Sequence, residues 1–237
     1  MSWEMDFDEL WSTKATPFLP VVQYRMEGNA LDSSDNGYNG TWTGTEAYVG
    51  GVIEGTQAAN FNGSSRVSIT GGAALNVTSL TVAAWAHVVS APSSFTGFVS
   101  RYIATGDRRT WTVTITPEGA IDFWTGSSSG AVAKAMRMTS LIPFETWCHI
   151  AVSYLHGTGV VGMYLNGISA AFSGDQHTSL NQSDNDVPLV VGALSDGVSP
   201  LYGYVDDVRI YNRALSQANI QRIMQRQDIQ AIEEWQT

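Results

Sequence analysis

The chain has one cysteine, Cys148, among 237 residues, so no disulfide can form within it. This is typical of proteins made in a reducing compartment. Neighbouring residues of a strand point to opposite faces, so Cys148 and His149 do not form a nucleophile and its base. We expect Cys148 to be a small core residue.

Positive charge is also scarce: 12 lysines and arginines against 22 acidic residues give a net charge of −10. A phosphate backbone requires a clustered basic surface, which argues against nucleic acid as a partner. No apolar run approaches the ~18 residues that a membrane-spanning helix requires, so we expect no membrane insertion. The acidic N-terminus lacks the basic flank and apolar run of a secretory signal.

Motifs of catalysis are missing as well. The histidines show no zinc-type spacing. Glycoside hydrolysis needs two carboxylates that flank the scissile bond. Asp206 and Asp207 are adjacent on a predicted strand and point apart, so they do not provide that pair. We therefore expect a protein that is not an enzyme.

Short segments with strand character dominate from residue 20 onward, separated by turns rich in the chain's 23 glycines. Many short strands without alternating helices predict a β-sandwich or jelly roll. One all-β domain can reach ~200–250 residues, so a single domain accommodates them. The clearest predicted strands are 21–25, 66–69, 80–88, 111–116, 120–124, 148–154, 160–165, 168–172, 187–191 and 204–211.

The segment 204–211 is the strand around which the rest is organised. Strict alternation places Asp206 on the same face as Val208 and Ile210, which is the expected core face. A carboxylate there must meet donors or a cation, because an unpaired buried charge is too costly. Asp207 and Arg209 would share the other face and pair at the surface, for little net stability.

Four stretches of the chain carry a further pattern: Asp32–Thr41, Leu80–Trp85, Trp147–Tyr154 with Tyr164–Gly167, and Tyr204–Ser216. In this order they resemble the laminin-G-like, concanavalin A-like lectin and glucanase jelly rolls. The resemblance implies an all-β jelly-roll sandwich over residues 20–215. We expect residues 1–19 to form an N-terminal docking arm and residues 216–237 a helical tail, whose first helix Ser216 would cap.

The same resemblance implies a structural calcium ion, held between the early Asp-Ser-Ser loop and the aspartate of the closing strand. Carboxylate and amide oxygens are the ligands that calcium takes in loops. The positions that match are Asp32, Asn36 and Asp206. Asp35 stands where the family often has glycine, and it either adds a ligand or adds repulsion. The alternative needs no ion: Asp32 makes an Asx-turn and Asp206 caps backbone amides.

Sugar binding is a further hypothesis, because an exposed aromatic ring beside aspartate and arginine suits a shallow groove. The candidates are Asp107, Arg109, Trp111 and Trp124, provided that the predicted hairpin borders the concave sheet. The alternative is that both tryptophans pack in the core or on a sheet face, which is the usual position of large apolar side chains.

Apolar residues at helical spacing in the arm, and others in the tail, are candidate contacts with a partner protein. A helix this short is not stable alone, so it must dock on some surface, which could equally be its own sandwich. These residues are Trp3, Phe7, Leu10, Trp11, Ile232 and Trp235.

Two functions follow from these patterns. The first is a phage virion component, made in the host cytoplasm, such as a capsid decoration or tail-associated protein. It would dock on other virion proteins, or on copies of itself, through its terminal arms. The second is an extracellular, calcium-dependent lectin-like module for cell-surface glycans.

Overall fold

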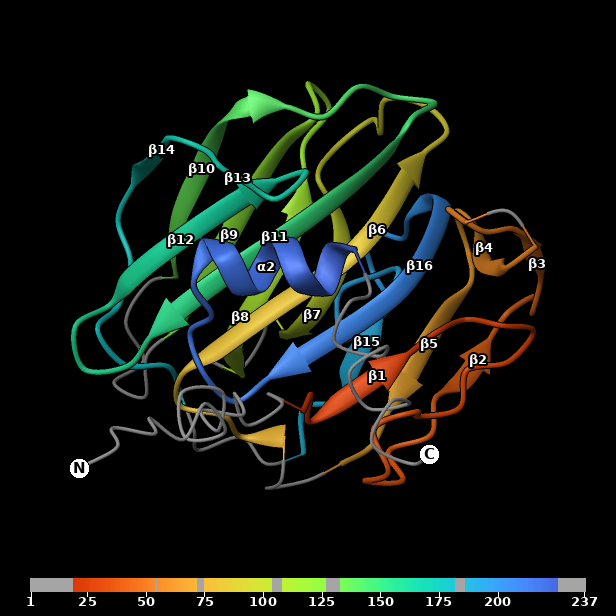
Figure 1. Ribbon diagram of the computed structural model, residues 1–237, viewed down its shortest axis with the longest axis horizontal. Coiled ribbons are helices and arrows are strands. Elements are labelled where there is room, and N and C mark those ends of the chain that lie inside the picture. The colour runs from red at the N-terminus through yellow and green to blue at the C-terminus, as the bar shows by residue number, and fades with distance from the viewer. Residues whose placement is uncertain are drawn as a thin grey trace, which may run out of the picture.

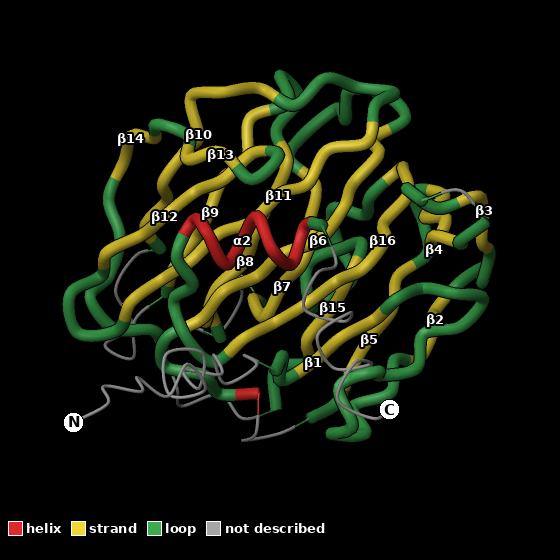
Figure 2. Tube along the Cα trace, in the orientation of Figure 1, coloured by secondary structure: helices red, strands yellow, loops and turns green. Residues whose placement is uncertain are grey.

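The computed structural model describes residues 19–53, 55–71, 75–103, 108–126, 133–181 and 186–225. Two antiparallel sheets stack face to face, with one helix, α2 (Gln217–Met224), lying across the outside of the nearer sheet (Figure 1). Figure 2 shows that strands make up most of both layers. The predicted all-β sandwich with a C-terminal helix is confirmed.

The sheet that carries the helix, here called sheet A, has the strand order β13-β12-β11-β6-β16-β4-β3, and β1 also pairs with β16. The strand β16 therefore contacts three partners and forms the hub of this layer. The bounds are β1 (Val22–Tyr24), β3 (Tyr48–Gly50), β4 (Gln57–Asn62), β6 (Leu80–Val88), β11 (Trp147–Leu155), β12 (Val160–Leu165), β13 (Ile168–Ser169) and β16 (Tyr202–Tyr211).

The opposite layer, sheet B, has the order β14-β10-β9-β8-β7-β15-β5-β2. Side chains from the inner faces of both sheets fill the space between them, as in other sandwiches. The rings of Phe123 on β9 and Tyr154 on β11, for example, lie 6.2 Å apart across this core. The bounds are β2 (Thr41–Thr43), β5 (Arg66–Ile69), β7 (Thr96–Tyr102), β8 (Arg109–Ile115), β9 (Ala120–Thr125), β10 (Lys134–Leu141), β14 (Phe172–Gly174) and β15 (Leu189–Val191).

The strand β16 contains a β-bulge that the alternation pattern did not predict. Asp206 lies opposite Trp85 and Arg209 opposite Ala83, so three steps on β16 match two on β6. Asp207 is the extra residue of the bulge, and its φ is 48°. The bulge inverts the alternation, because one inserted residue moves every preceding side chain to the other face. The prediction that Asp206 faces the core is therefore wrong: it lies on the outer face.

Asp207 and Arg209 do pair, but inside the protein. The guanidinium donates to both carboxylate oxygens, at 2.9 Å from Nε and 2.8 Å from Nη2. Gln23 on the neighbouring β1 also donates its side-chain amide to Asp207, at 3.0 Å. Asp207 is 4% exposed and Arg209 1%, so the predicted surface position is wrong. A buried ion pair needs such additional hydrogen bonds to offset desolvation.

The helix α2 packs on the outer face of sheet A as the tail pattern predicts. Ser216 caps it by accepting a hydrogen bond from the Asn219 amide. Ile220 and Ile223 are buried in a cluster that includes Ala83 and Ala151. Because these two alanines are small, the helix can approach the strands β6 and β11 closely.

The long strands β7 and β10 of sheet B were not predicted from the sequence, and neither were β2 in the same sheet and β3 and β4 in sheet A. The segment of β7 contains Gly97 and Arg101, neither of which favours a buried strand. Arg101 is nevertheless 1% exposed, and its guanidinium donates to the carbonyl of Leu75 and the amide oxygen of Asn76. In β10, the exposed Arg137 lies between the buried Met136 and Met138, and this short alternation is a weak strand signal.

Gly97 allows a close approach of backbones that holds β7 against the loop after β15. A Cβ at this position would lie 2.2 Å from the carbonyl carbon of Ala193. We predict that Gly97→Ala lowers the free energy of unfolding by about 2 kcal/mol or more, since the backbone must shift. Urea denaturation measures this, with Gly50→Ala as the control, because a Cβ on Gly50 meets nothing within 4 Å. Equal losses in the two variants would contradict the prediction.

Candidate functional site

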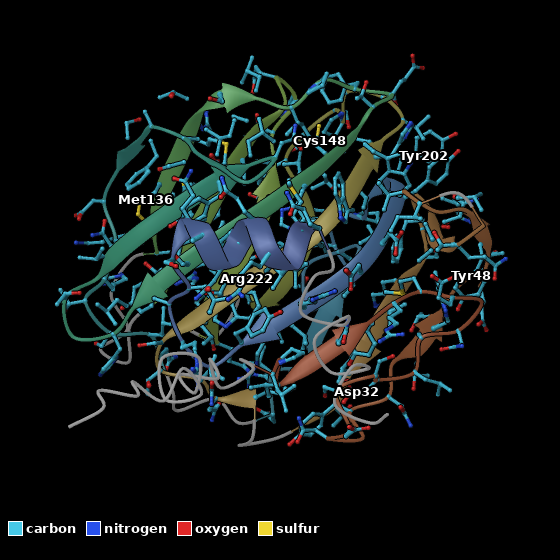
Figure 3. All side chains as sticks on the ribbon, in the orientation of Figure 1. Asp32, Tyr48, Met136, Cys148, Tyr202 and Arg222 are labelled. Atoms are coloured by element: carbon cyan, nitrogen blue, oxygen red, sulfur yellow. The ribbon has the colours of Figure 1, made fainter. Side chains whose placement is uncertain are left out.

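A pocket of about 370 Å³ opens at one end of the sandwich, where the loop between β6 and β7 meets the start of β16. Two aromatic side chains line it and remain open to solvent: Phe95 is 43% exposed and Tyr202 52%. Figure 3 shows Tyr202 at the upper right, where β16 begins. Such a concave site with exposed rings is the default candidate for ligand binding.

Backbone hydrogen bonds fix the floor of this pocket. The carbonyl of Ser199 accepts from the Gly97 amide at 2.8 Å and from the Thr96 hydroxyl at 3.0 Å. The amide of Val89 donates to the carbonyl of Tyr202 at 3.3 Å. The pocket is therefore formed by the fold itself and does not depend on a ligand to assemble it.

The rim of the pocket supplies hydroxyl groups without charge. Ser90, Ser93 and Ser94 are exposed and line it, next to Pro92, in a loop whose composition is typical of turns. No charged side chain occurs among the described residues that line the pocket. The lining thus combines apolar rings with neutral hydrogen-bonding groups.

Sequence reasoning missed this site, because Phe95 and Tyr202 are far apart along the chain. The one local signal is a phenylalanine at the end of the run Ala91-Pro92-Ser93-Ser94. An apolar ring in a turn segment, where polar residues are usual, is a hint of exposure and function.

Two of the predicted calcium ligands, Asp32 and Asp206, accept hydrogen bonds from backbone amides. Asp32 accepts hydrogen bonds from the amides of Gln23, Ser34 and Tyr38, at 2.9–3.0 Å, and from the Ser34 hydroxyl. The bond to the amide of Ser34 is the Asx-turn of the alternative hypothesis. On the outer face, Asp206 accepts from the amide of Val52 at 3.1 Å.

Asp35 and Asn36 are exposed in the same loop as Asp32. The side-chain amide of Asn36 donates a hydrogen bond to the backbone carbonyl of Val21. Across the described residues, histidine, cysteine, aspartate and glutamate nowhere form a group of three or more that could hold a metal ion. Asp32, Asp35 and Asp206 therefore do not form such a group. Calcium binding itself stays a prediction.

The predicted sugar-binding cluster does not form. Trp111 points into the core and is 1% exposed, as the packing alternative held. Trp124, partly buried, lies on the other face of sheet B, where its indole donates to Thr114. Arg109 lies opposite Tyr102 at the start of β8. Asp107 lies outside the described residues.

The predicted partner contacts cannot be placed in this fold. They lie in residues 1–18 and 226–237, outside the described part of the chain. The docking roles of these segments therefore stay predictions. The residues concerned are Trp3, Phe7, Leu10, Trp11, Ile232 and Trp235.

A family model described as the concanavalin A-like lectin/glucanases superfamily matches residues 61–221. The chain belongs to this superfamily. The predicted resemblance is confirmed. Among curated proteins, no sequence matches the chain. Within the described residues, no helix is long and apolar enough to cross a membrane.

Solved structures share the fold of this superfamily member over most of its length. Domain 4 of AbnA, an extracellular arabinanase from Geobacillus stearothermophilus solved in complex with arabinotriose, is similar with a TM-score of 0.70. Its identity is 25%, over 86% of this chain and 98% of that domain. The binding domain of Paraclostridial Mosquitocidal Protein 1 is similar with a TM-score of 0.66 and 14% identity.

The binding domain of botulinum neurotoxin DC, solved in complex with rat synaptotagmin II, is similar with a TM-score of 0.65 and 11% identity. The match covers 87% of this chain and 51% of the toxin domain. For the mosquitocidal protein the shares are 86% and 51%. The chain thus spans about half the length of these toxin domains, and at such identities the likeness shows the fold alone.

The bonds of Asp32 lead to a prediction about the loop and the ion. Asp32→Asn should lower the free energy of unfolding by about 1–2 kcal/mol, because charge-assisted bonds to backbone amides are weakened. Asp35→Asn, at an exposed position, is the control and should change it little. The melting temperature of the wild type is measured with calcium and with chelator, because a bound ion raises it. A calcium-dependent rise that Asp32→Asn abolishes would restore the ion to this loop.

His149 on β11 leads to a prediction about pH. Burial, helped by the charge of Arg209 and opposed by Asp207, lowers the pKa of His149 to about 4 from 6.5. As the pH falls, the unfolded chain therefore binds a proton at His149 before the folded protein does. The contribution of the neutral imidazole to the free energy of unfolding is fully present above pH 6.5 and is lost as the pH drops toward 4. His149→Gln should flatten this slope in urea denaturation. His156→Gln, at an exposed site, should keep the wild-type slope; equal slopes in all three proteins would refute the assignment.

Proposed function

We propose that this protein is a non-catalytic carbohydrate-binding domain whose pocket, bounded by Phe95 and Tyr202, holds the sugar. The observation that carries the proposal is the pocket itself, with two exposed rings and a rim of hydroxyls. The similarity to an arabinanase domain that was solved with arabinotriose supports it.

The chemistry of the lining suits a sugar. A pyranose or furanose ring has faces of C–H groups, which an aromatic ring covers, and a rim of hydroxyls. Serine hydroxyls both donate and accept hydrogen bonds, so they match that rim without imposing a charge. Because burying an ion without a partner is costly, an uncharged lining favours a neutral sugar over an acidic one.

The same lining supports binding without hydrolysis. Glycoside hydrolases in most families use two carboxyl groups on either side of the bond that is cleaved. Among the described residues that line the pocket there is neither aspartate nor glutamate. A sugar held between Phe95 and Tyr202 would therefore meet no general acid there.

A role in a virion rests on the two terminal segments, which lie outside the described residues. That role, its partner proteins and the place where the protein acts stay predictions. A display of sugar-binding domains on a larger particle is compatible with both hypotheses. The pocket is the part of the proposal that the geometry supports.

The test is a glycan array followed by calorimetry on the best ligand. Phe95→Ala should raise the dissociation constant roughly tenfold or more, because one face of the sugar loses its aromatic cover. Phe172→Ala is the matched control: this ring is 39% exposed on β14 and does not line the pocket. Both variants should keep the wild-type melting temperature. The proposal is overturned if no neutral glycan on the array binds the protein, or if the two variants bind the ligand with equal affinity.

A further inference from the structure

Three aromatic side chains lie directly opposite one another on the outer face of sheet A. Tyr204 on β16 pairs with His87 on β6, and His87 pairs with Trp147 on β11. The rings of His87 and Tyr204 are stacked with centroids 5.1 Å apart, and those of His87 and Trp147 meet edge to face at 5.5 Å. All three are partly exposed. We call them the aromatic row.

The aromatic row lies beyond the part of the face that helix α2 covers. Figure 1 shows the helix crossing the middle of sheet A, while the end of β6 and the starts of β11 and β16 extend past it. Under the helix, the strands β6 and β11 carry the small residues Ala83 and Ala151. Large rings that are gathered on a sheet face and partly exposed are typical of an interaction surface.

The aromatic row is continuous with the pocket through Tyr202. Tyr202 lines the pocket and precedes Tyr204 by two residues on β16, before the bulge, so both side chains lie on the same face. A ligand that fills the pocket can therefore pass over Tyr202 onto the row. Neighbouring strands lie about 4.8 Å apart, so the three rings of the row follow one another across the sheet along such a path.

We propose that the aromatic row is an extended subsite for an unbranched neutral oligosaccharide whose end occupies the pocket. This inference rests on the proposed function and adds the ligand's length and polarity to it. Each ring of the row offers a face or an edge to a successive sugar unit. Among the described residues, neither carboxylate nor guanidinium belongs to the row or to the pocket lining, so the path is matched to an uncharged chain.

The net charge of the protein points to the same class of ligand. With a formal charge of −10, the surface repels acidic polysaccharides at long range. A neutral chain experiences no such repulsion and gains contact area with every unit that it lays on a ring. The affinity should therefore increase with chain length until the ligand covers both the pocket and the row.

The experiment compares trimers with hexamers of the linear arabino-, xylo-, cello- and manno-oligosaccharides, by calorimetry on the full chain. For at least one series we expect the hexamer to bind roughly tenfold more tightly than the trimer. Trp147→Ala should remove this gain and leave the affinity for the trimer unchanged. Phe95→Ala should weaken the binding of both the trimer and the hexamer. The control Phe172→Ala should weaken the binding of neither.

Tyr204→Leu is a second variant of the row, which keeps an apolar side chain in case Trp147→Ala does not fold. It should also reduce the preference for the hexamer. If trimer and hexamer bind the wild type equally, or if neither row variant changes the preference, the row is no subsite, while the pocket proposal stands. If none of the oligosaccharides binds, the proposed function fails and this inference fails with it.

Discussion

The bulge at Asp207 is the constraint on which the rest of this structure depends. The strand β16 pairs with β4 before the bulge and with β1 after it, and with β6 on its other side throughout. One extra residue lets Val208 and Ile210 face the core while Tyr204 faces outward. Without it, either the valine and isoleucine would be exposed or the aromatic residue would be forced into the core. The ion pair of Asp207 with Arg209, supported by Gln23, holds the inserted residue in place.

The outer face of sheet A is divided into two parts with different chemistry. One part carries alanines and is covered by α2, whose isoleucines complete a second apolar cluster. The other carries the aromatic row and ends at the pocket. The protein thus stabilises one half of this face with its own helix, while the rings of the other half are partly exposed. This division, together with an uncharged pocket, is what makes a neutral and extended ligand physically reasonable.

Local patterns located the right residues more often than they identified the right roles. Asp32 was singled out as an ion ligand, and in the structure its oxygens accept hydrogen bonds from the backbone amides of Gln23, Ser34 and Tyr38. Trp111 and Trp124 were grouped because they lie on neighbouring strands. They belong to opposite faces of sheet B, because Trp111 pairs with Thr125, the residue next to Trp124. A hydrogen-bond register of this kind is not readable from the spacing of two aromatic residues.

The sequence alone determined the fold class, the helix that Ser216 caps, and the hairpin of β12 and β13, whose turn residues Asn166 and Gly167 have φ values of 51° and 74°. Each of these depends on residues that are close in the chain: alternation with a period of two, a pair of turn residues, or one capping hydroxyl. Only the tertiary structure decided which face Asp206 occupies, that Asp207 and Arg209 are buried, and that Phe95 meets Tyr202 at a pocket. These outcomes depend on strand register and on loops from distant parts of the chain, and a shift of a single residue reverses every side chain that follows.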